Sequence, residues 1–279
     1  MRWRAATDDD VPQMEDFLQA HLETSMFLVS NLRRFGPAGA DHDYAMRYWV
    51  TGSPISGVFA LATNGAIMVQ WPDAGDWSEP LALVDRSVTR LIGESGQIAQ
   101  LRHAAGLDAA DTSLNSEETL FSLALDKATM PDGPGHLRRV VEADRPVLRD
   151  WMLDYDVNTL GLTRADAEAR VDREFDAALA AGSRRILAEG ETPLCLTGFN
   201  AVVDDIVQVG PVYTPPEHRG KGHARRAVAL HLQEARKDGA NRSILFATDP
   251  SAIAAYRAVG FRPIGRFSLI FFEHPQVLA

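Results

Sequence analysis

The chain has only one cysteine, Cys195, so neither an intramolecular disulfide nor a metal site of several thiolates can form. Cys195 lies between Leu194 and Leu196, and this apolar setting predicts a buried strand residue rather than a nucleophile. Long apolar runs are missing too, because none approaches the roughly 18 residues that span a bilayer. Residues 1–10 also lack the apolar core of a signal peptide. We therefore expect a cytoplasmic protein with no membrane partner.

A surplus of basic residues is also missing, since 28 Lys and Arg stand against 38 Asp and Glu. Residues 1–133 hold 9 basic and 19 acidic residues, a net charge of −10, and the remainder holds 19 of each. Because nucleic-acid binding depends on neutralising phosphates, this balance argues against DNA or RNA as a partner. The acidic half would instead attract a cationic molecule over long range.

The length of 279 residues and the hydrophobic content of 46% predict two domains with buried cores. Met130–Gly135 is rich in proline and glycine and separates two apolar segments. We therefore expect one domain at 1–130 and a second at 134–279.

Two short segments of the first half recur in the second. Arg4–Val11 is echoed by Arg139–Pro146, each a short strand leading into a capped helix, and Leu101–Leu107 resembles Ala255–Phe261. Such spaced self-similarity predicts a tandem repeat of one fold.

The apolar periodicity predicts the individual elements. In the first half the predicted helical segments are Val11–Phe35 and Leu81–Ile92. Three strands are predicted between them, with a hairpin turn at Asn64-Gly65: Arg47–Thr51, Val58–Thr63 and Ala66–Trp71. In the second half two helices are predicted at Arg145–Tyr155 and Arg164–Ala181. A meander of three strands follows, and then a helix from Ala224 and a strand at Ser243–Thr248; the strands of the meander are Arg184–Glu189, Leu194–Val203 and Ile206–Tyr213.

A glycine-containing loop, His218–Ala224, stands between a predicted strand and a predicted helix. Gly220 and Gly222 allow positive φ and a close approach of the backbone to a ligand. The helix start adds unpaired amides and the positive end of its dipole, so the loop predicts a pyrophosphate site. We expect four basic side chains to add charge there: Arg219, Lys221, Arg225 and Arg226. No Ser or Thr follows Lys221, which excludes a Walker loop and with it a nucleotide kinase.

The spacing of Arg219, Gly222 and Ala224 resembles the acetyl-CoA loop of the GCN5-related N-acetyltransferases, the GNAT family. Asp249–Phe261 is similar to the second signature of that family, a helix start leading to Tyr256 and then to Gly260-Phe261. The resemblance implies an α+β fold with a mixed, mostly antiparallel sheet flanked by helices, here in two tandem copies. It also implies acetyl-CoA as co-substrate.

The resemblance further implies roles for individual residues. The main chain of Val212, Tyr213 and Thr214 would bind the pantetheine arm, and the pyrophosphate would lie on Arg219, Gly220, Lys221, Gly222, His223 and Ala224. Asp249 stands where the family usually has an asparagine that contacts the cofactor. Tyr256 would donate a proton to the departing thiolate; its alternative is an aromatic residue that packs beneath the helix.

No general base is evident. The candidates near strand ends are Glu189, Asp204, Asp205, Gln208, Glu217 and His218, and a water relay to a carbonyl is an equal alternative. His218 and His223 have no partner at metal-ligand spacing, so we expect no metal. His231 falls on the apolar face of its helix and is interpreted as a packing residue.

We expect the protein to transfer an acetyl or other acyl group from acetyl-CoA to the amino group of a small amine, an amino acid or a peptide N-terminus. The alternatives are a module that senses acyl-CoA without turnover, and a tandem enzyme resembling aminoacyl-transferases. In the first half, Trp71–Trp77 replaces the glycine loop and Arg102 stands at the position of Tyr256. We expect this half to have lost its cofactor site and to shape the acceptor side.

Overall fold

The computed structural model describes residues 2–278 and divides into two compact units. Unit 1 comprises the chain up to Leu120 together with the segment from Gly265 onward, and unit 2 is Phe121–Ile264. The linker Met130–Gly135, expected at a domain boundary, lies inside unit 2. The division falls elsewhere because the end of β6 (Thr112–Ala124) packs in unit 2 and most of β12 (Arg262–Gln276) packs in unit 1.

Unit 1 contains a sheet with the strand order β1-β2-β3-β4-β5-β12. The pairs are antiparallel except for β4 and β5, which run parallel. The elements are β1 (Arg4–Ala5), α1 (Val11–Gln19), α2 (Leu22–Phe35), β2 (Met46–Gly52), β3 (Ile55–Ala62), β4 (Ala66–Gln70), α3 (Ser78–Leu81), β5 (Val88–Glu94), α4 (Ser95–Ala104) and β6 (Thr112–Ala124).

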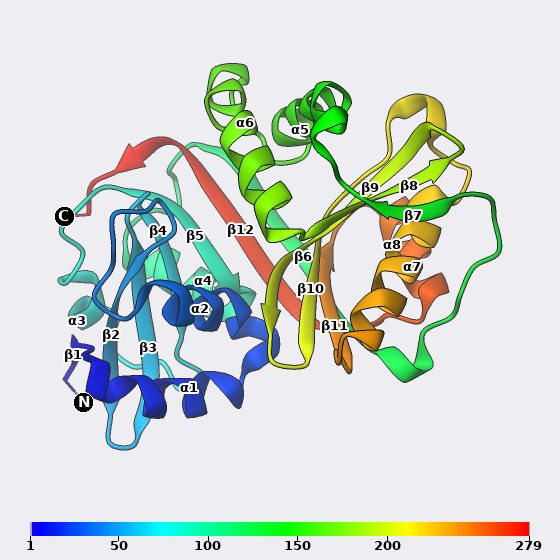
Figure 1. Cartoon of the computed structure of the whole chain (residues 1–279). Coiled ribbons are helices and arrows are strands. Elements are labelled where there is room, and N and C mark those ends of the chain that lie inside the picture. The colour runs from blue at the N-terminus through cyan, green and yellow to red at the C-terminus, as the bar shows by residue number, and fades with distance from the viewer. Residues whose placement is uncertain (1, 279) are drawn as a thin grey trace. The chain divides into compact units, whose positions relative to one another are not determined.

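Unit 2 repeats this order, with β10 and β11 as its parallel pair in a sheet ordered β6-β11-β10-β9-β8-β7. The second repeat comprises β7 (His136–Arg139), α5 (Arg145–Asn158), α6 (Arg164–Ala181), β8 (Arg184–Glu189), β9 (Thr192–Val203), β10 (Ile206–Tyr213), α7 (His223–Lys237), β11 (Arg242–Ala247), α8 (Pro250–Val259) and β12 (Arg262–Gln276), most of which lies in unit 1. Both sheets are mostly antiparallel with helices against them, as expected of two tandem copies of one fold (Figure 1).

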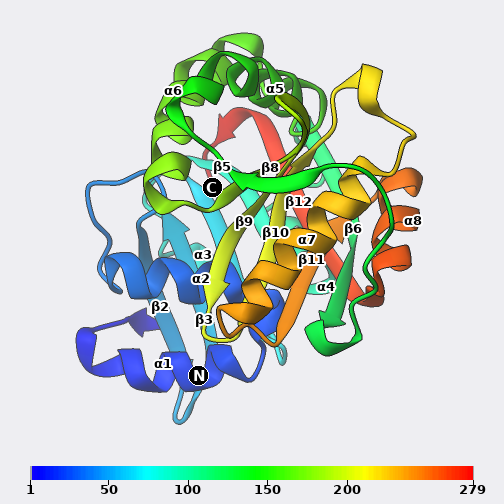
Figure 2. The ribbon, with the colours of Figure 1, turned by 45° about the vertical axis from the view of Figure 1, so that its right-hand side comes forward.

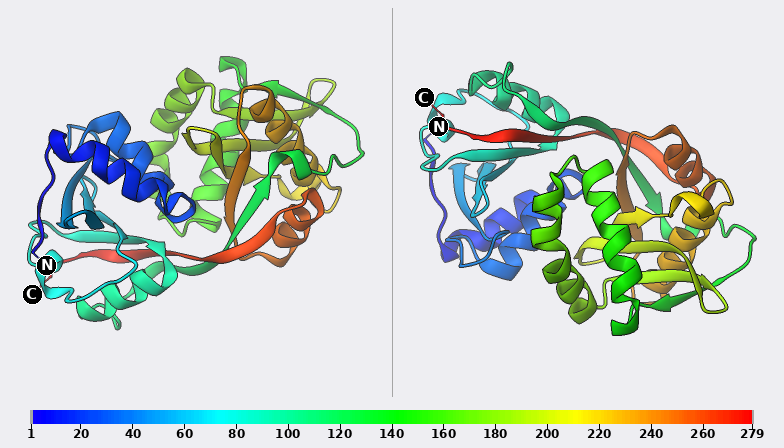
Figure 3. Two further views of the ribbon diagram at one scale, coloured as in Figure 1. Left: turned by 90° about the horizontal axis from the view of Figure 1, so that it is seen from below. Right: turned by 90° about the horizontal axis from the view of Figure 1, so that it is seen from above.

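The two repeats exchange their last strands. β6 ends the first repeat and lies beside β11 in the sheet of unit 2, whereas β12 ends the second repeat and lies beside β5 in unit 1. The pairing of Phe267 with Glu94 and of Phe271 with Arg90 fixes this register, and Figure 3 shows the red strand β12 running along β5. Each sheet is therefore completed by sequence from the other half.

An ion pair recurs at the start of both repeats. The Arg4 guanidinium donates to both oxygens of Asp10 at 2.6 Å, and the Arg138 guanidinium donates to both oxygens of Asp144 at 2.7 Å. In each case the carboxylate also accepts a backbone N–H three residues before it. The repeat is therefore in register at Arg138 rather than at Arg139, which the sequence comparison had aligned with Arg4.

In unit 2 the helices lie on opposite faces of the sheet. Residues of α5 and α6 pack on one face, against Ile186, Leu196 and Tyr213. Residues of α7 and α8 pack on the other, against Val207, Val209 and Leu245, and Figure 2 shows α7 crossing the sheet in front of β10. The α7–α8 face therefore carries the glycine loop.

The structure changes two expectations for unit 1. The predicted helix Leu81–Ile92 is wrong: a turn and loop follow α3, and strand β5 begins at Val88, where pairing with both β4 and β12 outweighs the helix-like apolar spacing. The predicted helical region Val11–Phe35 is broken between α1 and α2 at Ala20-His21. Strands β6 and β12 were not predicted.

The glycines after α4 and α8 occupy equivalent places but differ in their surroundings. Gly106 has φ +68° with no atom within 4 Å of an added Cβ, whereas Gly260 has φ +115° with Leu123 Cδ1 at 3.1 Å and the Lys127 carbonyl at 3.2 Å. We expect Gly106→Ala to lower the free energy of unfolding by about 1 kcal/mol, the usual cost of a left-handed residue. Gly260→Ala should cost about 2 kcal/mol more, since strain and contact add. Urea unfolding of both variants checks this, and equal losses would contradict it.

Candidate functional site

The strands β10 and β11 part from each other halfway along their length. They pair only from Ile206 to Gln208, although β10 continues to Tyr213 and β11 to Ala247. On its other side β10 remains paired with β9, with an irregular register between Val209 and Val212. The β11-facing main-chain groups of β10 beyond Gln208, which include those of Val212 and Tyr213, are thus left outside the ladder.

The glycine loop leads from the end of β10 into the first turn of α7. Gly220 has φ +74° and Gly222, the residue that caps α7, has φ +80°, both in the left-handed region. An added Cβ on Gly220 would meet no atom within 4 Å. The first amide bonded within the helix is that of Arg226, which donates to the Gly222 carbonyl at 3.1 Å. The preceding amides, from His223 to Arg225, therefore have no acceptor within the helix and can bind an anion.

Basic side chains of the loop donate hydrogen bonds to different carbonyl groups. Arg219 is exposed over 57% of its side chain and donates from Nε to the Thr214 carbonyl at 2.9 Å. Lys221 Nζ donates to the Glu217 carbonyl at 3.0 Å. Arg226, expected to add charge at the loop, instead donates to the carbonyls of Pro131 and Gly135 at 2.8 and 3.3 Å. Arg226 therefore holds the linker against α7.

A second set of contacts joins Arg219 to α5. The Tyr213 hydroxyl donates to Asp154 Oδ2 at 2.7 Å, and Arg219 Nη2 lies 3.9 Å from the same oxygen. Burial and the Asp154 carboxylate raise the pKa of Tyr213 to about 12. Asp154 was not predicted from the sequence, because nothing in a helical aspartate indicates a partner 59 positions away.

The second signature lies at the start and end of α8. The Asp249 carboxylate caps α8 by accepting the Ala252 amide at 2.8 Å, and the hydrogen bond from Ser251 is the main cause that lowers its pKa. Arg219 is among the charges that lower this pKa, so the two signatures lie in one neighbourhood. Tyr256 is 9% exposed and packs edge-on to Phe261 within the apolar cluster of the α7–α8 face. This packing agrees with the alternative role weighed for Tyr256.

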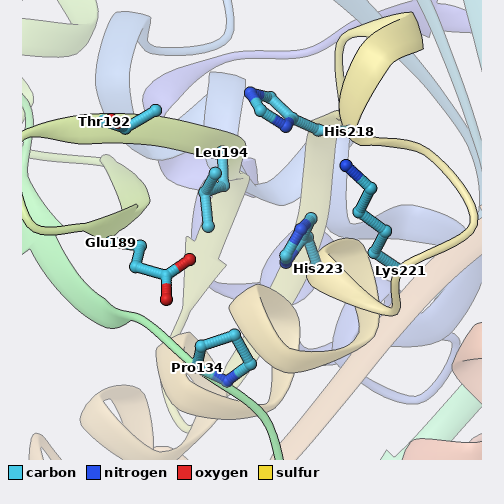
Figure 4. Close-up of a pocket in the computed structure, with 7 residues that line it drawn as sticks. All are labelled: Pro134, Glu189, Thr192, Leu194, His218, Lys221 and His223. Atoms are coloured by element: carbon cyan, nitrogen blue, oxygen red, sulfur yellow. The ribbon is translucent and has the colours of Figure 1, made fainter.

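A pocket of about 610 Å³ lies on the other side of the loop (Figure 4). His218 and Lys221 stand on one wall and Glu189, at the end of β8, stands opposite, with His223 between them. Burial lowers the pKa of His223, and the charges of His218 and Lys221 lower it further. The pocket shares Lys221 and His223 with the glycine loop, but it includes neither Tyr256 nor residues of the gap between β10 and β11.

Three further general-base candidates lie in or just before β10. Asp204 and Asp205 form the turn from β9 to β10, at the end away from the glycine loop. Gln208 is 3% exposed where the ladder ends, and its Nε2 donates to the Val209 carbonyl at 2.9 Å. Cys195 is buried on β9, and burial raises the pKa of its thiol to about 12. It is a strand residue, as predicted, and not a thiolate nucleophile.

Unit 1 fills the equivalent places with side chains. The Trp71 amide, just beyond the end of β4, donates to Gln97 Oε1 at 2.5 Å, and the Trp71 indole packs against Trp3 and Trp77. In place of α7 there is the single turn α3. Arg102 donates to the carbonyls of Leu107 and Asp108, at the end of its own helix.

Residues 2–278 contain neither a candidate metal cluster nor a candidate membrane span. No group of three or more His, Cys, Asp or Glu is placed to hold a metal ion in that part of the chain. None of the helices described there has the length and apolar character needed to cross a membrane.

Residues 148–261, from α5 to the residue after α8, match the model of the acetyltransferase (GNAT) family. This segment belongs to the GNAT family. Its members transfer acyl groups from acetyl-CoA, and the GNAT segment contains both the parted strands and the glycine loop. No curated protein sequence matches the chain.

Solved structures share the fold over nearly the whole chain. A Drosophila protein superposes with a TM-score of 0.70 at 12% identity, over 97% of this chain and 98% of its own. A GCN5-related N-acetyltransferase from Kribbella flavida gives 0.60 at 17% identity, over 91% and 95%. A tandem GNAT protein from the clavulanic acid biosynthesis pathway gives 0.57 at 18% identity, over 99% of both chains. These likenesses concern the fold of both repeats, beyond the segment matched by the family.

His231, interpreted as a packing residue, is 2% exposed and stacks on Phe199 with ring centroids 3.8 Å apart. Burial lowers its pKa to about 3. Below pH 6.5 the unfolded chain binds a proton that the folded chain does not, so stability should fall from about pH 6.5 to 3 by up to about 1.4 kcal/mol per unit. His231→Leu should flatten this dependence in urea unfolding across pH, and the exposed-site control His136→Leu should not. An unchanged pH dependence in His231→Leu would contradict the assignment.

Proposed function

We propose that the chain is an acetyl-CoA-dependent N-acetyltransferase that acts on the amino group of a small molecule, an amino acid or a peptide N-terminus. The observation that carries this proposal is the parting of β10 and β11 directly before a left-handed glycine loop and a helix start. An extended amide-containing arm that ends in a pyrophosphate is complementary to these groups. No metal ion is invoked.

The residues that would bind acetyl-CoA follow the order of the chain. The main chain of Val212, Tyr213 and Thr214 would bind the pantetheine amides as a strand would. The pyrophosphate would lie on Arg219, Gly220, Lys221, Gly222, His223 and Ala224, where open space above Gly220 leaves room for it. Asp249 would contribute less than an asparagine, since its carboxylate is already engaged in capping α8.

The chemistry requires positioning and proton transfer rather than a covalent enzyme intermediate. When bound, acetyl-CoA supplies an activated thioester. The amine must lose a proton, because a lysine-like amine of pKa about 10.4 is free base in roughly one of two thousand molecules at pH 7. Tyr256 is proposed as the proton donor to the leaving thiolate.

Only unit 2 is proposed to bind acetyl-CoA. In unit 1, the amide of Trp71 is already bonded to Gln97, and the short turn α3 has fewer than the eight or so residues of an ordinary helix. Residues 1–130 would thus be a degenerate copy without a cofactor loop, and residues 134–279 would carry the transferase.

Replacing Gly222 tests the anion site. Because its φ of +80° is unfavourable for a β-branched residue, Gly222→Val should weaken acetyl-CoA binding by about 100-fold or more. The matched control is Gly239→Ala, which changes a positive-φ glycine just beyond the opposite end of α7 and should leave affinity unchanged. Calorimetry on the wild type should also give one site per chain. Unchanged affinity in Gly222→Val, or two sites, would exclude the proposal.

Replacing Tyr256 separates a transferase from a sensor of acyl-CoA. The buried packing of Tyr256 favours the sensor as the second candidate. If Tyr256 donates the proton, Tyr256→Phe should lower kcat by about 100-fold with little change in acetyl-CoA affinity or in Tm. The exposed Tyr44 offers the control Tyr44→Phe, which should change none of these. A Tyr256→Phe variant that melts early but keeps full turnover per folded molecule would instead assign Tyr256 to packing.

A further inference from the structure

Arg184, the first residue of β8, lies beside the irregular part of β10. It pairs with Gly198 of β9, and a Cβ added to Gly198 would lie 3.2 Å from Arg184 Cγ and 3.2 Å from Pro211 Cδ. Ile186, two residues further along β8, packs in the cluster with α5 and α6, so Arg184 projects towards the same helices. The absence of a side chain at Gly198 therefore lets the stem of Arg184 lie next to Gly210-Pro211, where β10 has left β11.

The acidic groups nearest to Arg184 already have another partner. Asp156 is 3% exposed on α5, and Glu174 lies on α6. Arg170 is within 2.6 Å of Glu174 and 3.4 Å of Asp156. This second arginine binds both carboxylates, so the cluster of two acids and two bases is neutral and leaves Arg184 as its less engaged member.

The Arg184 guanidinium has donors to spare. Its Nη1 lies 2.8 Å from Met152 Sδ, a weak acceptor. Within residues 2–278 no carboxylate oxygen lies within the 4.0 Å of an ion pair with Arg184. A guanidinium carries about five N–H groups in a planar fork, and burial lowers the pKa of this one more than Glu174 and Asp156 raise it. A partly desolvated cation with unused, coplanar donors is suited to a planar anion.

We propose that Arg184 binds a carboxylate of the acceptor, so that the acceptor is an amino acid or short peptide rather than a simple amine. The proposal rests on the proposed function, because it places the acceptor beside the gap between β10 and β11. The acceptor nitrogen attacks the thioester carbon, the C–N bond forms as the C–S bond breaks, and the proton lost by the nitrogen balances the thiolate. Arg184 touches only the carboxylate and takes no part in these bond changes. Its role is specificity.

The test is a matched series of acceptors. Thiol release from acetyl-CoA is followed with glycine, β-alanine and 4-aminobutyrate, which vary the distance from amine to carboxylate, and with glycinamide, which lacks the carboxylate. For the preferred amino acid, Arg184→Gln should raise KM about 100-fold, as expected for a lost charged pair. KM for glycinamide and for acetyl-CoA should stay within about twofold, because neither loses a contact. For Arg184→Lys, KM for this amino acid should lie between the values of the wild type and Arg184→Gln, since lysine keeps the charge but not the planar fork of N–H donors.

Arg164→Gln is the control variant. Arg164 begins α6, is exposed over 67% of its side chain and pairs with Glu168 on the helix surface, so its loss should leave every KM unchanged. If Arg184→Gln raises KM equally for glycine and glycinamide, or if wild-type enzyme prefers glycinamide, the proposal is overturned. If Arg184→Gln unfolds at a lower temperature than the wild type, Arg184→Lys, which retains the charge, allows the same comparison of KM for glycine and glycinamide.

A binding measurement separates this proposal from the proposed function. With coenzyme A present, N-acetylglycine should bind the wild type but bind Arg184→Gln at least tenfold more weakly. Binding of this kind without turnover of any acceptor would leave the carboxylate site standing and remove the transferase. Turnover of an acceptor, together with equal affinity of the wild type and Arg184→Gln for N-acetylglycine, would keep the transferase and overturn the carboxylate site.

Discussion

The early end of the β10–β11 ladder, after three residue pairs, is the feature on which the candidate site of unit 2 depends. Backbone amides and carbonyls released from a sheet need new partners. They offer an extended ligand the same directional bonds as another strand would. The bulged register opposite β9 and the left-handed loop continue this arrangement, so strand end, loop and helix start form one track of main-chain donors and acceptors. Side chains then determine only which groups are recognised at the two ends of this track.

The equivalent place in unit 1 is occupied by side chains. In unit 1 the β4–β5 ladder also stops early, at Met68 and Ile92. There the amide of Trp71, just beyond β4, is bonded to Gln97, and three indole rings pack together nearby. These indoles belong to the apolar core of unit 1, so the same side chains that occupy this place also stabilise the fold.

Much of unit 2 was predictable because its local patterns and tertiary contacts agree. The bounds of α6, β8 and β10 were predicted to the residue, and Asp249 and Gly260 begin and end α8 as expected. The prediction of β5 was wrong because its partners are distant in sequence, and periodicity alone favoured a helix. The Asp154–Tyr213 contact and the buried pairing of Arg170 with Asp156 were invisible for the same reason. Charged residues on a helix usually face water, and only tertiary packing shows which of them do not.

The exchange of β6 and β12 has a consequence for how the protein is made. Unit 1 places β12 beside β5, yet β12 follows every other element of the second repeat in the chain and so leaves the ribosome after them. Until then, the β5 edge of a growing sheet is open, and open edges invite pairing with other chains. Folding of the first unit thus cannot be finished before synthesis of the second.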